Sequence, residues 1–155
     1  GVSVYGPDEM AGIDNINAQI IQAPLNVLDQ RFLTSGAAKR LNAAGGELYV
    51  RSIFLQGLLL MPATERPHSF KRWAEKLAVF DSHVESNGLD RASFCLGFVA
   101  SQLAVRRCVV GVETAEQLAQ LVAAFKAGSQ KDYDVEQLSS GDLGLIDPRE
   151  WDRTV

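Results

Sequence analysis

The chain has little cysteine, little histidine and no excess of positive charge. Its 155 residues include two cysteines and two histidines, and the formal net charge is −4. A negative chain is a poor ligand for nucleic acid or for an anionic membrane surface, so we exclude both as main partners. The two cysteines, Cys95 and Cys108, stand in apolar settings. They are predicted to be free, buried thiols in a reducing compartment, the cytoplasm.

Long apolar runs are also missing. None approaches the roughly 20 residues that a membrane helix needs, and residues 1–5 (GVSVY) are not the basic stretch that opens a signal peptide. Apolar residues make up 46% and charged residues 22% of the chain, which is ordinary for a globular protein. One domain over residues 1–155 is predicted. Because the chain opens with a strand-like segment and no methionine, we expect it to be trimmed or part of a longer polypeptide.

Familiar catalytic and phosphate-binding motifs do not occur. There is no G-x-x-x-x-G-K-[ST] loop, no G-x-G-x-x-G and no G-x-S-x-G elbow. His68 and His83 have no Cys, Asp or Glu partner at metal-ligand spacing, so surface or structural roles are favoured over a metal site. Nothing in the pattern places two carboxylates at catalytic distance. The residues alone therefore assign no general acid–base pair and no metal.

Strand-like and helix-like segments alternate along the sequence. Apolar, β-branched runs predict strands at residues 1–5, 19–23, 47–55 and 108–112. Apolar residues at three- and four-residue spacing predict helices at 34–44, 70–84 and 114–126, and the pair Asn87-Gly88 is predicted to break the second of these. A short helix is predicted at 7–11, and Asp90 is predicted to cap another that buries Ala92, Cys95, Leu96, Val99 and Leu103. Residues 62–69 are predicted to form a loop, and the tail to be pinned by Leu138, Leu143, Ile146 and Trp151.

This alternation limits the possible fold classes. Four βα units, one of them with two helices in its connection, predict a parallel sheet with right-handed crossovers. Such a sheet is either a small doubly wound sheet or half of an eight-stranded barrel.

The turn from the last strand into the last helix has the most explicit local signal. An apolar run ends at Gly111, and Thr114 and Gln117 have the spacing of an S/T-x-x-E/Q capping box. Glu116 adds negative charge near the positive end of the helix dipole. In many α/β proteins such a turn offers backbone N–H groups to an anion, but the same turn also serves simply to join a strand to a helix.

Polar residues and glycines gather at the ends of the predicted strands, where parallel α/β proteins bind ligands. Ser3 and Gln22 offer neutral donors and acceptors suited to an amide. Gly57 and Gly111 allow a ligand to approach the backbone. The alternative for Gln22 and Ser52 is that both are satisfied polar groups inside a barrel. The remaining candidates of this set are Arg51, Gln56 and Thr114.

Together, these segments resemble the C-terminal half of the aldo/keto reductase family. The resemblance rests on residues 1–5 (GVSVY), 21–31 (IQAPLNVLDQR), 51–59 (RSIFLQGLL) and 110–118 (VGVETAEQL), and the tail 146–151 (IDPREW) is similar to the end of some members. It implies an α/β fold, the C-terminal half of a (β/α)8 TIM barrel with strands five to eight. It also implies an oxidoreductase that transfers hydride between a nicotinamide cofactor, NADP or NAD, and a small-molecule carbonyl or alcohol substrate.

The resemblance also implies roles for individual residues. Ser3 and Gln22 would hold the nicotinamide carboxamide. Arg51 occupies a position where many members stack an aromatic residue on the nicotinamide ring, and a guanidinium plane also stacks. Ser52, Leu55 and Gly57 would border the pyrophosphate, and Gly111, Glu113, Thr114 and Gln117 would line the adenosine end.

Departures from the family pattern qualify this expectation. The catalytic Asp, Tyr, Lys and His of the family have no counterpart here, so the chain alone is not expected to reduce carbonyls. Val4 replaces an Asn, and Gln120 and Leu121 replace a Glu-Asn pair that often touches adenine. Glu113 stands where NADPH-preferring members often carry Lys, Arg or Ser, and its carboxylate would repel a 2′-phosphate. Both NAD and NADP therefore remain open.

A half-barrel has two sheet edges, at residues 1–5 and 108–112, which proteins normally cover. We expect a missing N-terminal half or a second copy in a homodimer to cover them. Two other classes remain open: a non-catalytic nucleotide-binding or interaction module, and a scaffold without a ligand. Residues 62–69 and the tail after Gly128 are candidates for substrate contact.

Overall fold

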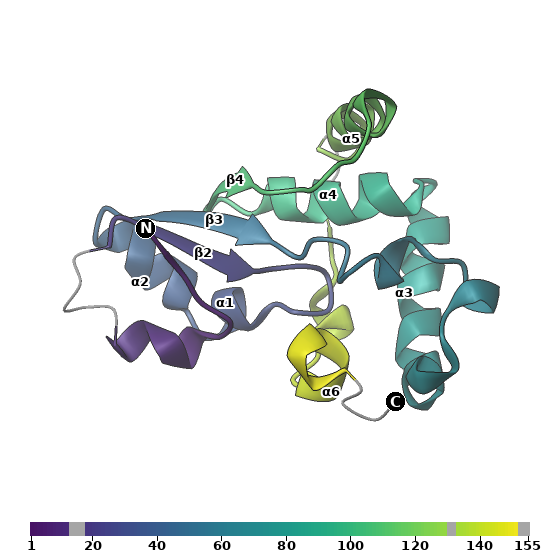
Figure 1. Ribbon diagram of the computed structural model, residues 1–155, viewed down its shortest axis with the longest axis horizontal. Coiled ribbons are helices and arrows are strands. Elements are labelled where there is room, and N and C mark those ends of the chain that lie inside the picture. Colours follow the sequence, from purple (N-terminus) through teal and green to yellow (C-terminus); the bar gives the residue numbers. More distant parts are fainter. Residues whose placement is uncertain (13–17, 130–132, 152–155) are drawn as a thin grey trace.

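A computed structural model describes residues 1–12, 18–129 and 133–151. Its centre is a sheet of four parallel strands in the order β1-β2-β3-β4 (Figure 1). Neighbouring strands in the sheet are also neighbours in sequence. The predicted series of parallel βα units is therefore confirmed. The strands are β1 (Val2–Ser3), β2 (Ile20–Pro24), β3 (Glu47–Arg51) and β4 (Val105–Cys108).

The two faces of the sheet differ in what covers them. Side chains alternate between the faces of a strand, and Ile21, Ala23, Leu48 and Val50 on one face have no exposed surface. The opposite face includes a row that crosses all four strands, because the register pairs Ser3 with Gln22, Gln22 with Tyr49 and Tyr49 with Arg107. None of these four side chains is fully buried.

Helices connect the strands. A 3₁₀ helix, η1 (Pro7–Gly12), follows β1, and both α1 (Arg31–Thr34) and α2 (Ala37–Ala43) follow β2. The connection from β3 to β4 contains the two long helices α3 (Ala74–Asn87) and α4 (Arg91–Ser101), as predicted. After β4 come α5 (Ala115–Gly128) and the short α6 (Leu143–Ile146). The other 3₁₀ helices are η2 (Leu58–Leu60), η3 (Ala63–Glu65), η4 (His68–Trp73), η5 (Glu136–Leu138) and η6 (Pro148–Glu150).

Local sequence signals end and start the long helices. Gly88 adopts a left-handed conformation, φ 63°, at the end of α3, where a residue with a Cβ would be strained. Two residues later, the Asp90 side chain accepts a hydrogen bond of 2.8 Å from the Ser93 N–H and caps α4. The predicted break after Asn87 and the predicted cap at Asp90 are both confirmed.

Charged side chains join the loop after β3 to these helices. Asp81 of α3 accepts hydrogen bonds from Arg66 and from Arg91 of α4. Burial alone would raise the pKa of the Asp81 carboxyl, but the bonds from the two guanidinium groups hold this pKa below its usual value. The three side chains therefore hold the helical layer together as an ionic network.

Two predicted boundaries in the first half of the chain are wrong. The helix predicted at 34–44 is two helices, because Gly36 has a left-handed backbone, φ 72°, and separates α1 from α2. The strand predicted at 47–55 ends at Arg51, because Ser52, Leu55 and Gln56 have φ of 59°, 48° and 53°. Such φ values are incompatible with an extended strand and turn the chain sharply.

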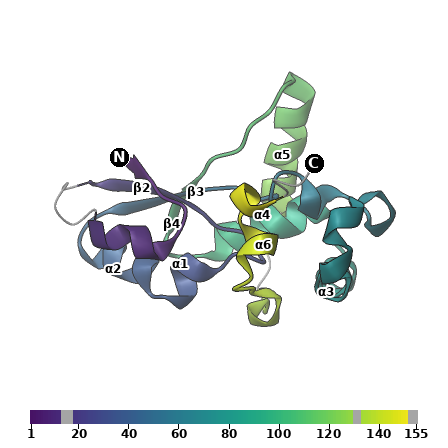
Figure 2. The ribbon, with the colours of Figure 1, turned by 60° about the horizontal axis from the view of Figure 1, so that its bottom comes forward.

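The last strand was predicted too late in the sequence. β4 is Val105–Cys108 rather than 108–112, and Val109 donates the following hydrogen bond, 2.7 Å, to the Val50 carbonyl. Because β3 ends at Arg51, residues beyond Val109 have no strand to pair with. In Figure 2 the chain accordingly leaves the sheet and rises to α5, which stands away from the strands.

Three further predictions are corrected by burial and local structure. Leu103, predicted in the core, is fully exposed because α4 ends at Ser101. Leu143 is 45% exposed and does not pin the tail, whereas Leu138 and Ile146 are buried. Residues 62–69, predicted as loop, contain η3 and the start of η4.

Candidate active site at the strand ends

Ser3, the last residue of β1, contacts Gln22 in the middle of β2. The register makes them direct neighbours, and the Ser3 hydroxyl donates a hydrogen bond of 3.2 Å to Oε1 of Gln22. Ser3 is exposed and Gln22 half-buried. This bond uses the Ser3 proton and the Gln22 amide oxygen, so the Gln22 amide nitrogen can still donate and the Ser3 oxygen can still accept. This pair has the chemistry to bind a primary amide.

Arg51 is the last residue of β3. Its guanidinium donates 3.0 Å to the Val4 carbonyl and 3.4 Å to the Ser52 hydroxyl. The Arg51 Cζ also lies 4.5 Å from the centre of the Tyr5 ring, a stacking distance. The same ring is contacted by Arg149 of the tail, at 3.7 Å. The tail thereby returns to the strand ends.

These side chains surround a cavity of about 270 Å³. Two of its three arginines are neutralised by carboxylates: Arg31 bonds Asp29 at 2.8 Å, and Arg149 bonds Asp147 at 2.6 Å. The hydrogen bonds from Arg149 hold the pKa of the Asp147 carboxyl below its usual value. The cavity is lined by Tyr5, Pro24, Arg31, Arg51, Ser52, Gln56, Ile146, Asp147, Pro148 and Arg149.

The turn after β3 separates this cavity from a second one. Ser52 and Gln56 line the first cavity, while Phe54, in the same turn, lines the second. Leu55 points into the core and has no exposed surface. Gly57 has φ of 87°, and no atom lies within 4 Å of the position that a Cβ would occupy. A ligand can therefore approach the backbone at Gly57.

The second cavity measures about 700 Å³ and lies between this turn, α4 and α5. Gly111 lines it, and open space surrounds the position where a Cβ would stand. Gln117 lies beside it with Gln120 and Leu121 from the next turn of α5. Apolar side chains and side-chain amides dominate its walls. This combination suits a planar, hydrogen-bonding group such as a nucleobase.

The start of α5 forms the predicted capping box. The Thr114 hydroxyl accepts from the Gln117 N–H at 3.2 Å. The Gln117 side chain accepts from the Glu113 N–H at 2.8 Å rather than from Thr114, one residue away from the predicted partner. Thr114 and the Glu113 side chain are exposed and do not line the cavity. The capping box thus orients the turn that carries Gly111.

The predicted site residues therefore form three groups. Arg51 and Ser52 line the cavity at the strand ends, and Gly111 and Gln117 line the cavity beside α5. Ser3 and Gln22 contact each other on the open face of the sheet but line neither cavity. Sequence reasoning missed Tyr5, Phe54 and Arg149, which complete the two cavities. The position of Tyr5, two residues after the end of β1, was a usable signal. Nothing in the sequence showed that Arg149 folds back onto Tyr5.

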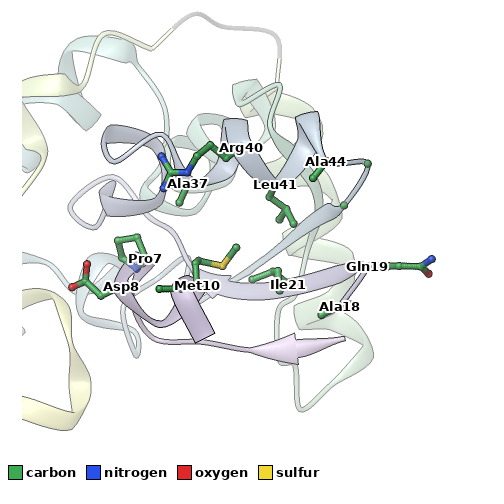
Figure 3. A pocket seen from close by; sticks show the side chains of 13 residues that line it. Pro7, Asp8, Met10, Ala18, Gln19, Ile21, Ala37, Arg40, Leu41 and Ala44 are labelled. Atoms are coloured by element: carbon green, nitrogen blue, oxygen red, sulfur yellow. The ribbon is translucent and has the colours of Figure 1, made fainter. Parts of the chain in front are cut away.

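Another cavity lies at the amino ends of β2 and β3. It measures about 730 Å³ and separates η1 from α2. Figure 3 shows Met10, Ile21 and Leu41 between these elements, while the Gln19 side chain points away. Ligands of parallel α/β folds bind at the carboxyl ends. We therefore assign the candidate site to the two smaller cavities.

The two cysteines do not provide reactive thiols. Cys95 and Cys108 are free, and burial raises the pKa of both thiols, which keeps them protonated and unreactive. Within the described ranges, no group of three His, Cys, Asp or Glu side chains is arranged to hold a metal ion. No helix in this part of the chain is both long and apolar enough for a membrane span.

The four parallel βα units have the fold of about half of an aldo-keto reductase (β/α)8 barrel. Among the solved structures that the chain is similar to are the holo and apo forms of aldo-keto reductase AKR11C1 from Bacillus halodurans. Identity is 17% and 15%, with TM-scores of 0.65 and 0.67.

The match covers 97% of this chain but 52% and 53% of those structures, so the chain spans about half of their length. No family model and no curated protein matches the sequence.

Proposed function

We propose that the chain is the cofactor-binding half of an aldo/keto reductase-like oxidoreductase. The enzyme would transfer hydride between a nicotinamide cofactor and a carbonyl or alcohol substrate. The observation that carries the proposal is the Ser3–Gln22 pair on the open face of a half-barrel whose fold matches a reductase. In this proposal the strands are the fifth to eighth of the barrel.

The residues present fit a nicotinamide cofactor. Ser3 and Gln22 would bind the carboxamide, and Arg51 would border the nicotinamide ring. Ser52 and Gly57 belong to the turn between the two cavities and would border the pyrophosphate, whereas Leu55, predicted with them, has no exposed surface and lies outside the site. Gly111, Thr114 and Gln117 would lie at the adenosine end, where the larger cavity has room for a nucleobase. The bound cofactor supplies the hydride, while the chain binds and orients it.

Glu113 bears on the choice between NAD and NADP. Its exposed carboxylate adjoins the turn at Gly111 and would repel a 2′-phosphate placed there. NAD is therefore the preferred cofactor in our proposal, and Glu113→Lys is expected to shift the preference towards NADP. The ratio of the two dissociation constants in wild type and variant measures this shift.

The proton donor of the reaction would come from a second set of βα units. The open sheet face and the edges at β1 and β4 would be covered by an N-terminal half or, in a homodimer, by a second copy. Along α5, Leu118, Val122 and Phe125 are 40–49% exposed on one stripe and would join this interface. We propose a cytoplasmic protein on the basis of its two free thiols.

Titration of the chain with NADH and NADPH, followed by nicotinamide fluorescence, tests the proposal. We expect saturable binding without turnover. Gly111→Leu would fill the larger cavity and weaken binding at least tenfold. Gly141→Leu is the matched control, because open space also surrounds Gly141 and this residue lines neither cavity.

The other outcomes identify the alternatives. If the chain binds the cofactor but addition of the upstream half gives no turnover, the chain is a non-catalytic nucleotide-binding module. Absence of binding to either cofactor would indicate a scaffold and would refute the proposal. Sedimentation as a stable monomer of 16.9 kDa would argue against both forms of edge pairing.

A further inference from the structure

We propose that the cavity at the strand ends binds a carboxylate through Arg51, so that the carbonyl substrate is a small oxo acid. The statement that the substrate has a carbonyl group rests on the proposed reductase function. The anion site is inferred independently, from the charges around the cavity. The proposal names the substrate class, which the fold leaves open.

Charge is the first reason. Of the three arginines that line the cavity, Arg31 and Arg149 each have a carboxylate within 2.8 Å. Arg51 has no carboxylate partner among the described residues, and its hydrogen bonds go to the neutral Val4 carbonyl and Ser52 hydroxyl. Glu9 lies nearby, but its carboxylate accepts from the Tyr5 N–H and does not line the cavity. Arg51 therefore offers an uncompensated positive charge.

The geometry of Arg51 is the second reason. A guanidinium has five N–H donors in a planar fork that matches a carboxylate. The contacts with Val4 and Ser52 engage two of these donors, and the guanidinium also packs against the Tyr5 ring. The rest of the fork is available to a ligand. Because the group is already held in place, little conformational entropy is lost when an anion binds.

The size of the cavity limits the ligand. At about 30 Å³ for each water, a volume of about 270 Å³ holds roughly nine water molecules. A carboxylate with a short carbon chain fits this space. Ser52 and Gln56, on the same wall, provide neutral groups for the remaining oxygens of the ligand.

Pyruvate and pyruvamide provide a test with matched probes, because they differ only in the carboxylate. Titration of the 155-residue chain at low ionic strength by calorimetry is expected to give at least tenfold tighter binding of pyruvate. R51Q should abolish this difference. R107Q is the matched control: Arg107 lies on the same sheet, but it donates to the Tyr49 hydroxyl and does not line the cavity. It should retain the full difference.

Equal affinity for the two probes, or no binding of either, overturns the proposal. So does a preference for pyruvate that persists in R51Q. Should R51Q fail to fold, the NMR signal of the Arg51 Nε–H in the wild-type chain replaces it, and this signal must shift with pyruvate and not with pyruvamide. NADH titration without pyruvate tests the reductase proposal separately. A chain that prefers pyruvate but binds no cofactor would leave the anion site standing and refute the reductase.

Discussion

The two faces of the sheet carry different kinds of side chain. On the helix-covered face, Ile21, Ala23, Leu48 and Val50 have no exposed surface. On the open face, one row contains Ser3, Gln22, Tyr49 and Arg107, which form two cross-strand hydrogen bonds: Ser3 to Gln22, and Arg107 to Tyr49 at 3.1 Å.

The interior of a (β/α)8 barrel is usually filled by branched apolar side chains. The open face instead has a polar row across its strands, so it differs from the usual apolar barrel interior. The covered face therefore stabilises the fold, and the open face is free for function.

The largest expected effect tests the covered face. Leu48→Ala should lower the free energy of unfolding by about 3 kcal/mol, because it leaves a cavity among fully buried neighbours. Urea denaturation measures the change. Gln22→Ala, on the adjacent strand but the open face, is the control and should cost less than about 1 kcal/mol. Similar costs for the two variants would contradict the contrast between the faces.

Helix α5 packs against α4 on one side and is exposed on the other, so its two sides can be compared in the same way. A Cβ on Gly128 would lie 2.0 Å from the Ser93 carbonyl oxygen. Gly128→Ala should therefore force the helices apart and cost about 2 kcal/mol. Gly111→Ala, where open space surrounds the new Cβ, should leave thermal stability unchanged. A stable Gly128→Ala chain would show that α5 is not locked onto α4.

The ionic network at Asp81 allows a further test of how the covered side is stabilised. Asp81→Asn should cost about 1.5 kcal/mol at pH 7, less than for a fully buried pair because water reaches the site. The folded-state pKa of Asp81 is lowered, so its contribution is present above the unfolded pKa and disappears as the pH falls through the folded value. Urea curves of wild type and variant should converge at acid pH. A pH-independent difference would exclude this ion network as the cause.

The smallest effect is expected on the open face. Tyr49→Phe removes the hydroxyl that accepts from Arg107 but keeps the ring. Because water replaces this partly exposed bond, the cost should be below about 0.5 kcal/mol. Thermal denaturation measures it against Tyr133→Phe. The Tyr133 hydroxyl donates 2.8 Å to the Gly128 carbonyl at the α4–α5 contact and should cost more. A larger loss of stability for Tyr49→Phe than for Tyr133→Phe would contradict the contrast between the open face and the packed helices.

Local chemistry that needs only neighbouring residues was predictable. Asp90, Gly88 and the Thr114–Gln117 pair specify caps through short-range hydrogen bonds or backbone freedom, and all act at the predicted helix ends. Alternation of apolar runs and helical periodicity was enough to predict parallel βα units. The rule that ligands bind at strand ends selected Ser3, Gln22, Arg51, Ser52 and Gly111 as candidates, whereas Gln117 was a candidate only through the family resemblance. Whether these residues bind a cofactor stays a prediction.

Pairing between distant segments was not predictable in the same way. The sequence determined that strands and helices alternate, where helices are capped and which strand faces are apolar, because these depend on residue type and spacing. Tertiary structure decided that β4 begins at Val105, since its limits follow from how far β3 extends. It also brought Arg149 onto Tyr5 across more than 140 residues and left Arg51 without a carboxylate partner in the described part of the chain. Such contacts depend on the path of the whole chain.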